Sequence, residues 1–190
     1  MAGASKTTPI GVLSFPALFT PRAPSPGADE RYSCVLIFDE NAQNTPEYKA
    51  MKKEALAAAQ AKWGTKATDM IQKGQLRLPF RDASEKSEFA GYDEGKIFVS
   101  LWTKQKPDVI DGRLNDVVPS DVFAGCLARA TYGCFAYEQQ GNKGVSFGLN
   151  NLQIADFTTP RLDGKKKGKN DFDALDNNST SQDEDDEIPF

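Results

Sequence analysis

The chain has 190 residues, with 23 basic side chains, 27 acidic side chains and no histidine. The missing histidine excludes Ser-His-Asp and Cys-His nucleophile systems and every zinc site that needs an imidazole ligand. Three cysteines (Cys34, Cys126 and Cys134) are an odd number and predict no disulfide framework, so we expect a protein of the reducing cytoplasm. No segment has transmembrane length, so we expect no membrane partner.

Two strands are predicted in the first part of the chain. Residues 10–20 are apolar and rich in β-forming side chains, and residues 31–39 have the composition of a buried strand. The segment between them, 21–29, is rich in Pro, Gly and Ser and predicts a loop.

One main helix follows. Thr45 is suited to the N-cap, Pro46 to the first helical position and Glu47 to the first turn, and Gly64 to the end of the helix. Residues 68–73 predict a further helical turn. The apolar face of the main helix is expected to consist of Tyr48, Met51, Ala55 and Ala59.

Strand patterns dominate the rest of the chain, at residues 75–80, 96–104, 126–138 and 145–153. Residues 139–144 predict the hairpin turn between the last two of these. About five main strands with one helix favour a mainly β fold, an OB-fold-like five-stranded barrel. A β-sandwich with an appended helix is the alternative, since the predicted helix follows the second main strand, whereas the usual OB-fold helix follows the third.

Binding of single-stranded nucleic acid requires cations for phosphates and exposed aromatic rings on which bases stack. In the strand at 96–104, alternation places three apolar side chains on one face, and the opposite face carries Lys96, Phe98, Ser100, Trp102 and Lys104. The alternative is that Phe98 and Trp102 pack under the helix or at an interface.

The strand at 126–138 has a similar pattern. Its small residues suit the core, and in that case Arg129, Phe135 and Tyr137 lie on the outer face, near Lys143 in the adjoining turn. Alternation alone does not decide which face is buried, because both faces carry aromatic residues. Arg77 and Arg81 flank an apolar tripeptide and are further candidate cations, although ordinary surface charge also explains them. The predicted DNA-binding residues are therefore Arg77, Arg81, Lys96, Phe98, Trp102, Lys104, Arg129, Phe135, Tyr137 and Lys143.

Four aspartates raise the alternative of a metal-dependent nuclease. Asp108, Asp111, Asp116 and Asp121 lie in one loop-rich stretch, and carboxylates can bind Mg²⁺. The acidic-x-Lys element of such nucleases does not follow at strand spacing. The missing element argues against a metal-dependent nuclease.

Charge divides the chain into a basic body and an acidic tail. Residues 171–190 contain eight acidic side chains and no Lys or Arg, so residues 1–170 carry 23 basic against 19 acidic side chains. Such asymmetry favours nucleic-acid interaction with an acidic appendage. Because residues 170–182 have almost no apolar content, we expect residues 163–190 to be a disordered linker and tail, and residues 1–162 to form the folded domain.

The chain ends in a run of carboxylates followed by an apolar tripeptide, which a purely solubilising tail does not need. Phe190 is suited to a small apolar pocket, and the carboxylates to the basic rim of that pocket. We interpret this motif as a partner-binding tail, composed of Asp183, Glu184, Asp185, Asp186, Glu187, Ile188, Pro189 and Phe190.

The tail resembles the C-terminal tip of bacterial and phage single-stranded DNA-binding proteins. The body resembles phage-encoded members of that class at residues 76–82 (LRLPFRD), 125–130 (GCLARA) and 141–153 (GNKGVSFGLNNLQ). The resemblance implies an OB-fold that coats single-stranded DNA without sequence specificity during phage replication, recombination or repair in the host cytoplasm. It implies no catalysis, no metal and no cofactor. It also implies assembly as a homodimer or along the strand, and recruitment of replication and recombination proteins by the tail.

Two other functions stay open from the sequence. In the first, the protein is an adaptor: the tail binds partner proteins and the body binds no nucleic acid. RNA is the other possible ligand, because stacking grooves discriminate weakly without contacts to the 2′-hydroxyl.

Overall fold

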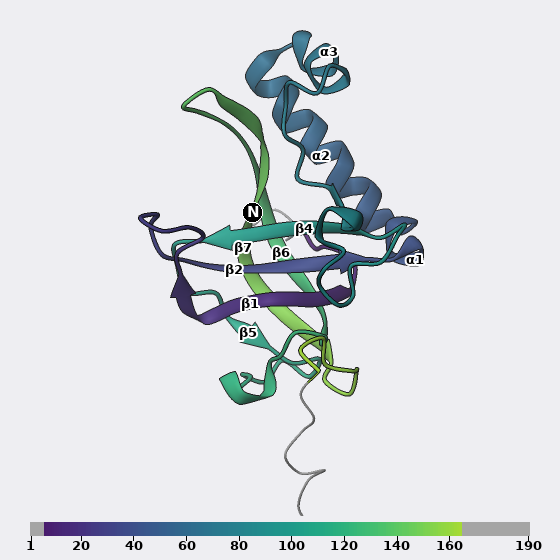
Figure 1. Cartoon of the computed structure of the whole chain (residues 1–190), viewed down its shortest axis with the longest axis vertical. Helices are drawn as coiled ribbons and strands as arrows, with labels where there is room; N and C mark the ends of the chain where they lie inside the picture. The colour runs from purple at the N-terminus through teal and green to yellow at the C-terminus, as the bar shows by residue number, and fades with distance from the viewer. Residues whose placement is uncertain (1–5, 165–190) are drawn as a thin grey trace, which may run out of the picture.

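The computed structural model describes residues 6–164, in which one seven-stranded sheet curls into a partly closed barrel (Figure 1). The strand order is β3-β4-β2-β1-β6-β7-β5, and a parallel pairing of β4 with β7 brings the two sides of the sheet together. The predicted mainly β, OB-like fold is confirmed, and the sheet does not divide into the two layers of a sandwich. The strands are β1 (Gly11–Arg22), β2 (Arg31–Phe38), β3 (Arg81–Asp82), β4 (Ile97–Thr103), β5 (Val109–Ile110), β6 (Leu127–Gln139) and β7 (Asn142–Asp156).

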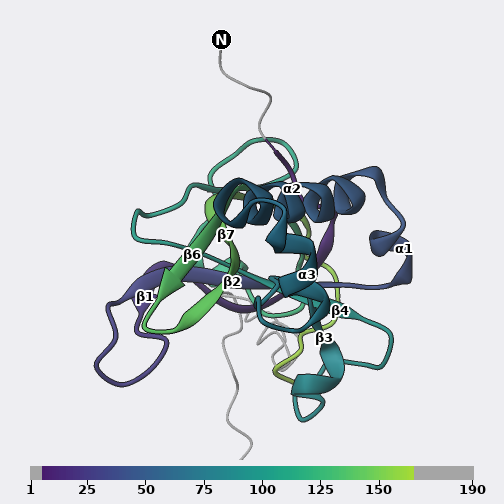
Figure 2. The same cartoon turned by 90° about the horizontal axis from the view of Figure 1, so that it is seen from above.

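The main helix, α2 (Pro46–Trp63), forms as predicted and lies across the barrel (Figure 2). The Thr45 side chain accepts a hydrogen bond from the backbone N–H of Tyr48, and Gly64 ends the helix with φ +61°. All four residues of the predicted apolar face are buried. The short helices α1 (Glu40–Gln43) and α3 (Lys66–Gln72) flank α2, and α3 covers most of the predicted further turn.

Two predicted elements differ from the structure. Residues 75–80 form no strand, and only Arg77 makes a single parallel bridge, to Gly144. The hairpin turn consists of Gln140 and Gly141, which both have positive φ, and β7 already begins at Asn142. Two successive positive φ angles are the geometry of a two-residue type I′ turn. The turn predicted at 139–144 is too long because residues 139 and 142–144 belong to the strands.

The sheet buries apolar side chains on both faces. On the inner face, Leu36 of β2 and Leu101 of β4 join the large core under α2. On the outer face, Ile37 and Phe98 form a second cluster with Tyr92. The chain between β3 and β4 covers this second cluster, and it includes a 3₁₀ turn at Ala83–Lys86.

None of the helices within residues 6–164 is long and apolar enough to cross a bilayer. The predicted boundary after residue 162 falls at the end of the described range. The predicted tail, Asp183 to Phe190, lies outside the described residues, as does the rest of the chain after residue 164.

Candidate nucleic-acid interface

A groove of about 660 Å³ lies on the outer side of the barrel, where residues 76–81 pass β7. The Arg77 backbone N–H donates to the carbonyl oxygen of Lys143, and the Val145 N–H donates to that of Arg77, both at 2.9 Å. These two bonds fix the loop against the strand without a regular ladder. The groove is lined by Leu76, Arg77, Leu78, Pro79, Phe80, Arg81, Glu85, Ser100, Tyr137, Val145 and Ser146.

An aromatic pair lies beside this groove. The rings of Trp102 on β4 and Phe135 on β6 meet edge to face, with centroids 5.8 Å apart. The Trp102 indole N–H donates to the hydroxyl oxygen of Ser146 at 3.3 Å, and Ser146 itself lines the groove. Trp102 is half-buried and Phe135 is 37% exposed, so both rings are fixed by protein contacts and still reach solvent.

Arg31, at the start of β2, places a cation on this pair. Its guanidinium carbon lies 4.8 Å from the centroid of the Trp102 ring, which is the geometry of a cation–π contact. Burial lowers the pKa of the Arg31 guanidinium, but an arginine stays charged at neutral pH. Within residues 6–164 no carboxylate forms an ion pair with Arg31, so its charge is available to a phosphate. Arg31 is not among the DNA-binding residues predicted from the sequence.

Three predicted residues line the groove itself. Arg77 has no ion-pair partner within residues 6–164, whereas Arg81 pairs with Glu85 and also lies 5.2 Å from the ring centroid of Phe98. Tyr137 is half-buried on the β6 wall. The structure therefore brings together five of the ten predicted residues, namely Arg77, Arg81, Trp102, Phe135 and Tyr137.

Lys143 and Lys104 lie at the margins and are held by carboxylates. Lys143 forms an ion pair with Glu138 at 3.0 Å across the β6–β7 hairpin, and the Trp63 indole N–H of α2 donates to the same carboxylate at 3.4 Å. Lys104 pairs with Asp29 at 2.9 Å. Both lysines are accessible, but a phosphate would have to compete with these partners.

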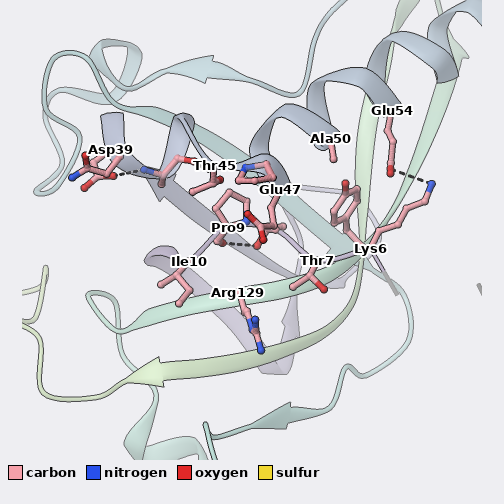
Figure 3. A pocket seen from close by; sticks show the side chains of 15 residues that line it. Lys6, Thr7, Pro9, Ile10, Asp39, Thr45, Glu47, Ala50, Glu54 and Arg129 are labelled. Atoms are coloured by element: carbon pink, nitrogen blue, oxygen red, sulfur yellow. Dashed lines mark hydrogen bonds and ion pairs between the residues drawn. The ribbon is translucent and has the colours of Figure 1, made fainter. Parts of the chain in front are cut away.

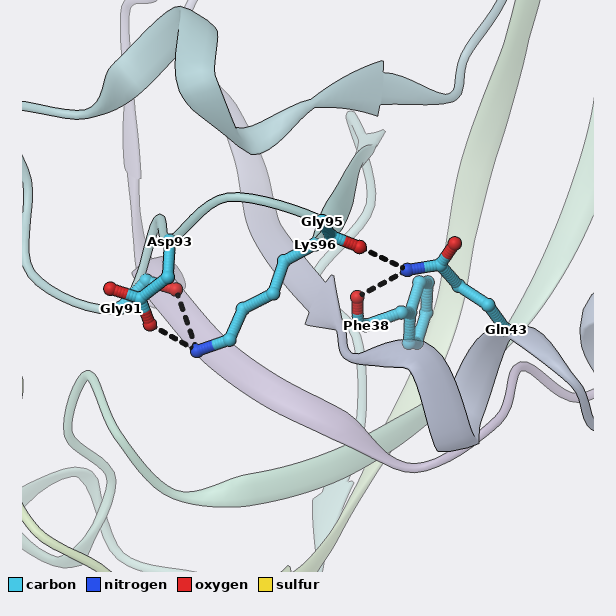
Figure 4. Close-up of polar contacts among 6 residues, drawn as sticks. All are labelled: Phe38, Gln43, Gly91, Asp93, Gly95 and Lys96. Carbon is cyan, nitrogen blue, oxygen red and sulfur yellow. Dashed lines mark hydrogen bonds and ion pairs between the residues drawn. The ribbon is translucent and has the colours of Figure 1, made fainter.

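Phe98 and Lys96 serve the fold on the outer face. The Phe98 side chain is fully buried beneath Tyr92, with ring centroids 5.4 Å apart, so it offers no face to a base in this structure. The Lys96 ammonium pairs with Asp93 and donates to the carbonyl oxygen of Gly91 at 3.3 Å (Figure 4). Alternation correctly placed Phe98 opposite the inner core, but the chain between β3 and β4 covers that part of the face.

Arg129 is also separated from the groove. It lies six residues before Phe135 on β6, roughly 20 Å along the strand. Its guanidinium donates to the Gln153 side chain at 2.8 Å, and it lines another pocket, of about 870 Å³, in which Lys6 and Glu54 form an ion pair at 3.1 Å (Figure 3). Three carboxylates line that pocket against two cations, which makes it a poor match for a polyanion.

The four aspartates of the nuclease alternative do not converge on a metal site. Within residues 6–164 no three His, Cys, Asp or Glu side chains are arranged to hold a metal ion. The Asp111 carboxylate instead accepts hydrogen bonds from the backbone N–H groups of Arg113 and Asn115, at 2.8 and 2.9 Å, which stabilises a turn. These bonds lower the pKa of Asp111, that from Asn115 most.

Comparison with known proteins decides the family. Residues 8–188 match the family model described as the ssDNA-binding protein of Enterobacter phage Enc34. The chain belongs to this family. A search among curated proteins finds no match.

Solved structures of phage proteins have the same fold. The Enc34 single-stranded DNA-binding protein in complex with ssDNA superposes with a TM-score of 0.64 at 15% identity, covering 79% of this chain and 85% of that one. The Enc34 protein alone gives 0.63 at 14% identity, covering 88% and 89%. The single-stranded DNA-binding protein gp2.5 of bacteriophage T7 gives 0.61 at 13% identity, covering 88% and 99%. At such identities the comparison shows the shared fold.

Proposed function

We propose that this member of the Enc34 family binds single-stranded DNA without sequence specificity and acts as a non-enzymatic coat protein. The observation that carries the proposal is the Trp102–Phe135 pair, which lies beside the groove with Arg31 over the indole. Membership of a family described by ssDNA binding supports the same ligand.

The chemistry of the groove suits a single strand better than a duplex. Every base has a flat face, so stacking on Trp102 and Phe135 needs no particular sequence and contributes about 1–3 kcal/mol per base. Bases in a duplex already stack on one another and cannot reach two rings fixed within the protein. Arg31 and Arg77 would neutralise phosphates along the path, which makes binding sensitive to salt. Arg81 would contribute in competition with its ion-pair partner Glu85.

The same family membership supports a proposal about the biological setting. We propose that the protein coats single strands during phage DNA replication, recombination or repair in the host cytoplasm. Its acidic tail, Asp183 to Phe190, would recruit the proteins of those pathways. A mildly basic body joined to an acidic, Phe-terminated end supports this division of work.

Equilibrium binding of fluorescent oligo-dT at several salt concentrations, with duplex competitor present, tests the proposal. We expect tight, salt-sensitive binding that duplex does not compete away. A second signal comes from the protein, because a Trp63→Phe variant leaves Trp102 as its one tryptophan, whose emission a stacked base should quench. No binding at low salt would overturn the proposal and leave the adaptor function.

Matched variants separate stacking from folding. Phe135→Ala should weaken oligo-dT binding about five- to 160-fold, whereas Phe135→Tyr keeps a ring face and should bind almost as the wild type does. Arg77→Gln should weaken binding and flatten its salt dependence. Arg113→Gln removes the same charge from an exposed turn that does not line the groove, and it should leave binding unchanged.

A further inference from the structure

A second aromatic surface lies on the outer face of the barrel, over the cluster that contains Phe98. The rings of Phe15 on β1 and Phe89 in the chain between β3 and β4 meet edge to face, with centroids 5.1 Å apart. Each side chain is 44% exposed, which is unusual for two phenylalanines that touch. Neither is used by the groove described above.

A cation accompanies these rings. The Lys86 ammonium lies 4.8 Å from the centroid of Phe15, 5.2 Å from that of Phe98 and 5.7 Å from that of Tyr92. Within residues 6–164 no carboxylate comes within ion-pair distance of this ammonium. Burial and the nearby positive charge of Arg81 both lower the pKa of Lys86, although Glu88 and Glu85 partly oppose them. A desolvated cation of this kind gains from an anion that arrives with a ligand.

The backbone at Phe15 is held in a rare conformation. Phe15 has φ +44°, in a strand, where a residue with a bulky side chain rarely has positive φ. It lies at the shift in register between Ser14 and Ala17, where β1 bulges against β2. Bulges of this type re-aim a side chain, and here the result is a phenyl ring turned toward Phe89 and Lys86. Strain that persists at an exposed aromatic side chain points to a binding role.

The surface is continuous with the groove. Arg81 lines the groove and also lies over Phe98, the ring shared with Lys86. Along β4, Phe98 and Trp102 occupy the same face four residues apart, roughly 13 Å, with exposed Ser100 between them. A strand of DNA leaving Trp102 past Arg81 therefore reaches Lys86 and the two exposed phenylalanines.

We propose that Phe15, Phe89 and Lys86 form a second base-stacking subsite for single-stranded DNA, reached from the groove by way of Arg81. The two phenyl rings stack bases, and the ammonium binds the phosphate between the subsites. This inference rests on the proposed function, since it extends the path of the same ligand. It predicts a longer occluded segment of DNA than the groove alone would give.

A length series of oligo-dT, from about 4 to about 20 nucleotides, tests the second subsite in Phe89→Ala. This variant is suitable because Phe89 is exposed and lies outside the strands and helices. We expect short oligonucleotides to bind as they do to the wild type. Long ones should bind at least about fivefold more weakly, a loss of about 1 kcal/mol. Phe89→Tyr keeps the ring and should restore the wild-type length dependence.

The outcomes distinguish this inference from the proposed function. If the wild type binds no oligo-dT of any length, the proposed function fails, and this inference fails with it. If Phe135→Ala weakens binding and Phe89→Ala has no effect at any length, the function stands and the second subsite is wrong; the exposed phenylalanines would then suit a protein partner. An equal loss at every length in Phe89→Ala, with an unchanged melting temperature, also overturns a separate subsite.

Discussion

Gly144 of β7 lies directly against the backbone of Arg77, so closely that a Cβ atom on Gly144 would be 2.4 Å from the Arg77 carbonyl oxygen. That oxygen accepts the hydrogen bond from Val145 that holds the groove wall in place. We therefore predict that Gly144→Ala displaces Arg77, lowers the free energy of unfolding by about 1–3 kcal/mol and weakens oligo-dT binding. Urea denaturation and oligo-dT titration of the same preparation measure both effects.

Gly133 supplies the control for stability. It lies in β6, next to β7, and a Cβ atom there would meet nothing within 4 Å. Gly133→Ala should therefore leave the free energy of unfolding unchanged or raise it slightly, because alanine has less conformational freedom than glycine in the unfolded chain. Equal destabilisation by the two substitutions would show that the contact with Arg77 is not the cause.

A second prediction concerns the contact between Arg31 and Trp102. Arg31→Gln removes one cation from the DNA path, so the slope of log K against log salt should become shallower by about 0.7, the value for one phosphate contact on a single strand. Affinity at low salt should fall about fivefold or more, because the variant loses both a phosphate contact and the cation–π contact that holds the Trp102 indole. Arg113→Gln provides the charge-matched comparison, and an unchanged slope in Arg31→Gln would contradict the assignment.

The sequence located the main helix and most of the main strands, although the strand predicted at 75–80 does not form. Strong capping signals at Thr45 and Pro46 located α2. Alternation grouped Phe135 with Arg129 and Tyr137 on one face of β6, but the burial in the structure was needed to show that the other face is the buried one. Both predictions depend on local patterns, in which a residue and the neighbours that decide its environment are close along the chain.

The parts that failed depend on contacts between distant segments. Alternation shows which residues of β4 share a face, but not that Tyr92 covers Phe98 and leaves Trp102 accessible. The role of Arg31 follows from the register of β2 against β4, in which Ser33 faces Trp102. Such pairings join residues far apart in sequence, and a single strand pattern does not encode them.

A third prediction concerns pH and the attachment of the β6–β7 hairpin to α2. The hydrogen bond from Lys143, and then that from Trp63, lower the pKa of Glu138 below its usual value of 4.5. Because the folded-state pKa is below the unfolded one, the stabilisation is fully present above about pH 4.5 and is lost as the pH falls through the folded-state pKa. In a Trp102→Phe variant, which retains only Trp63, the emission should stay constant from about pH 7 to about pH 5 and change below that range.

Glu138→Gln is the control for this titration. A glutamine can still accept from the Trp63 indole, but it carries no charge to lose, so the emission change below about pH 5 should disappear. An identical change in the glutamine variant would assign the effect to another carboxylate.

The last prediction separates the two chemical parts of the tail. Deleting Asp183 to Phe190 should abolish the capture of replication and recombination proteins from host lysate, and should leave oligo-dT affinity unchanged or increased, because an anion that competes for the basic groove is gone. Phe190→Ala removes the side chain suited to the partner's apolar pocket and keeps the five side-chain carboxylates of residues 183–187. It should therefore abolish capture without altering DNA affinity. Replacing the carboxylates by amides should instead raise DNA affinity, most strongly at low salt, where charge competition is least screened. If the deletion abolishes DNA binding, the tail contributes to the DNA interface and its role as a separate recruiting segment is wrong.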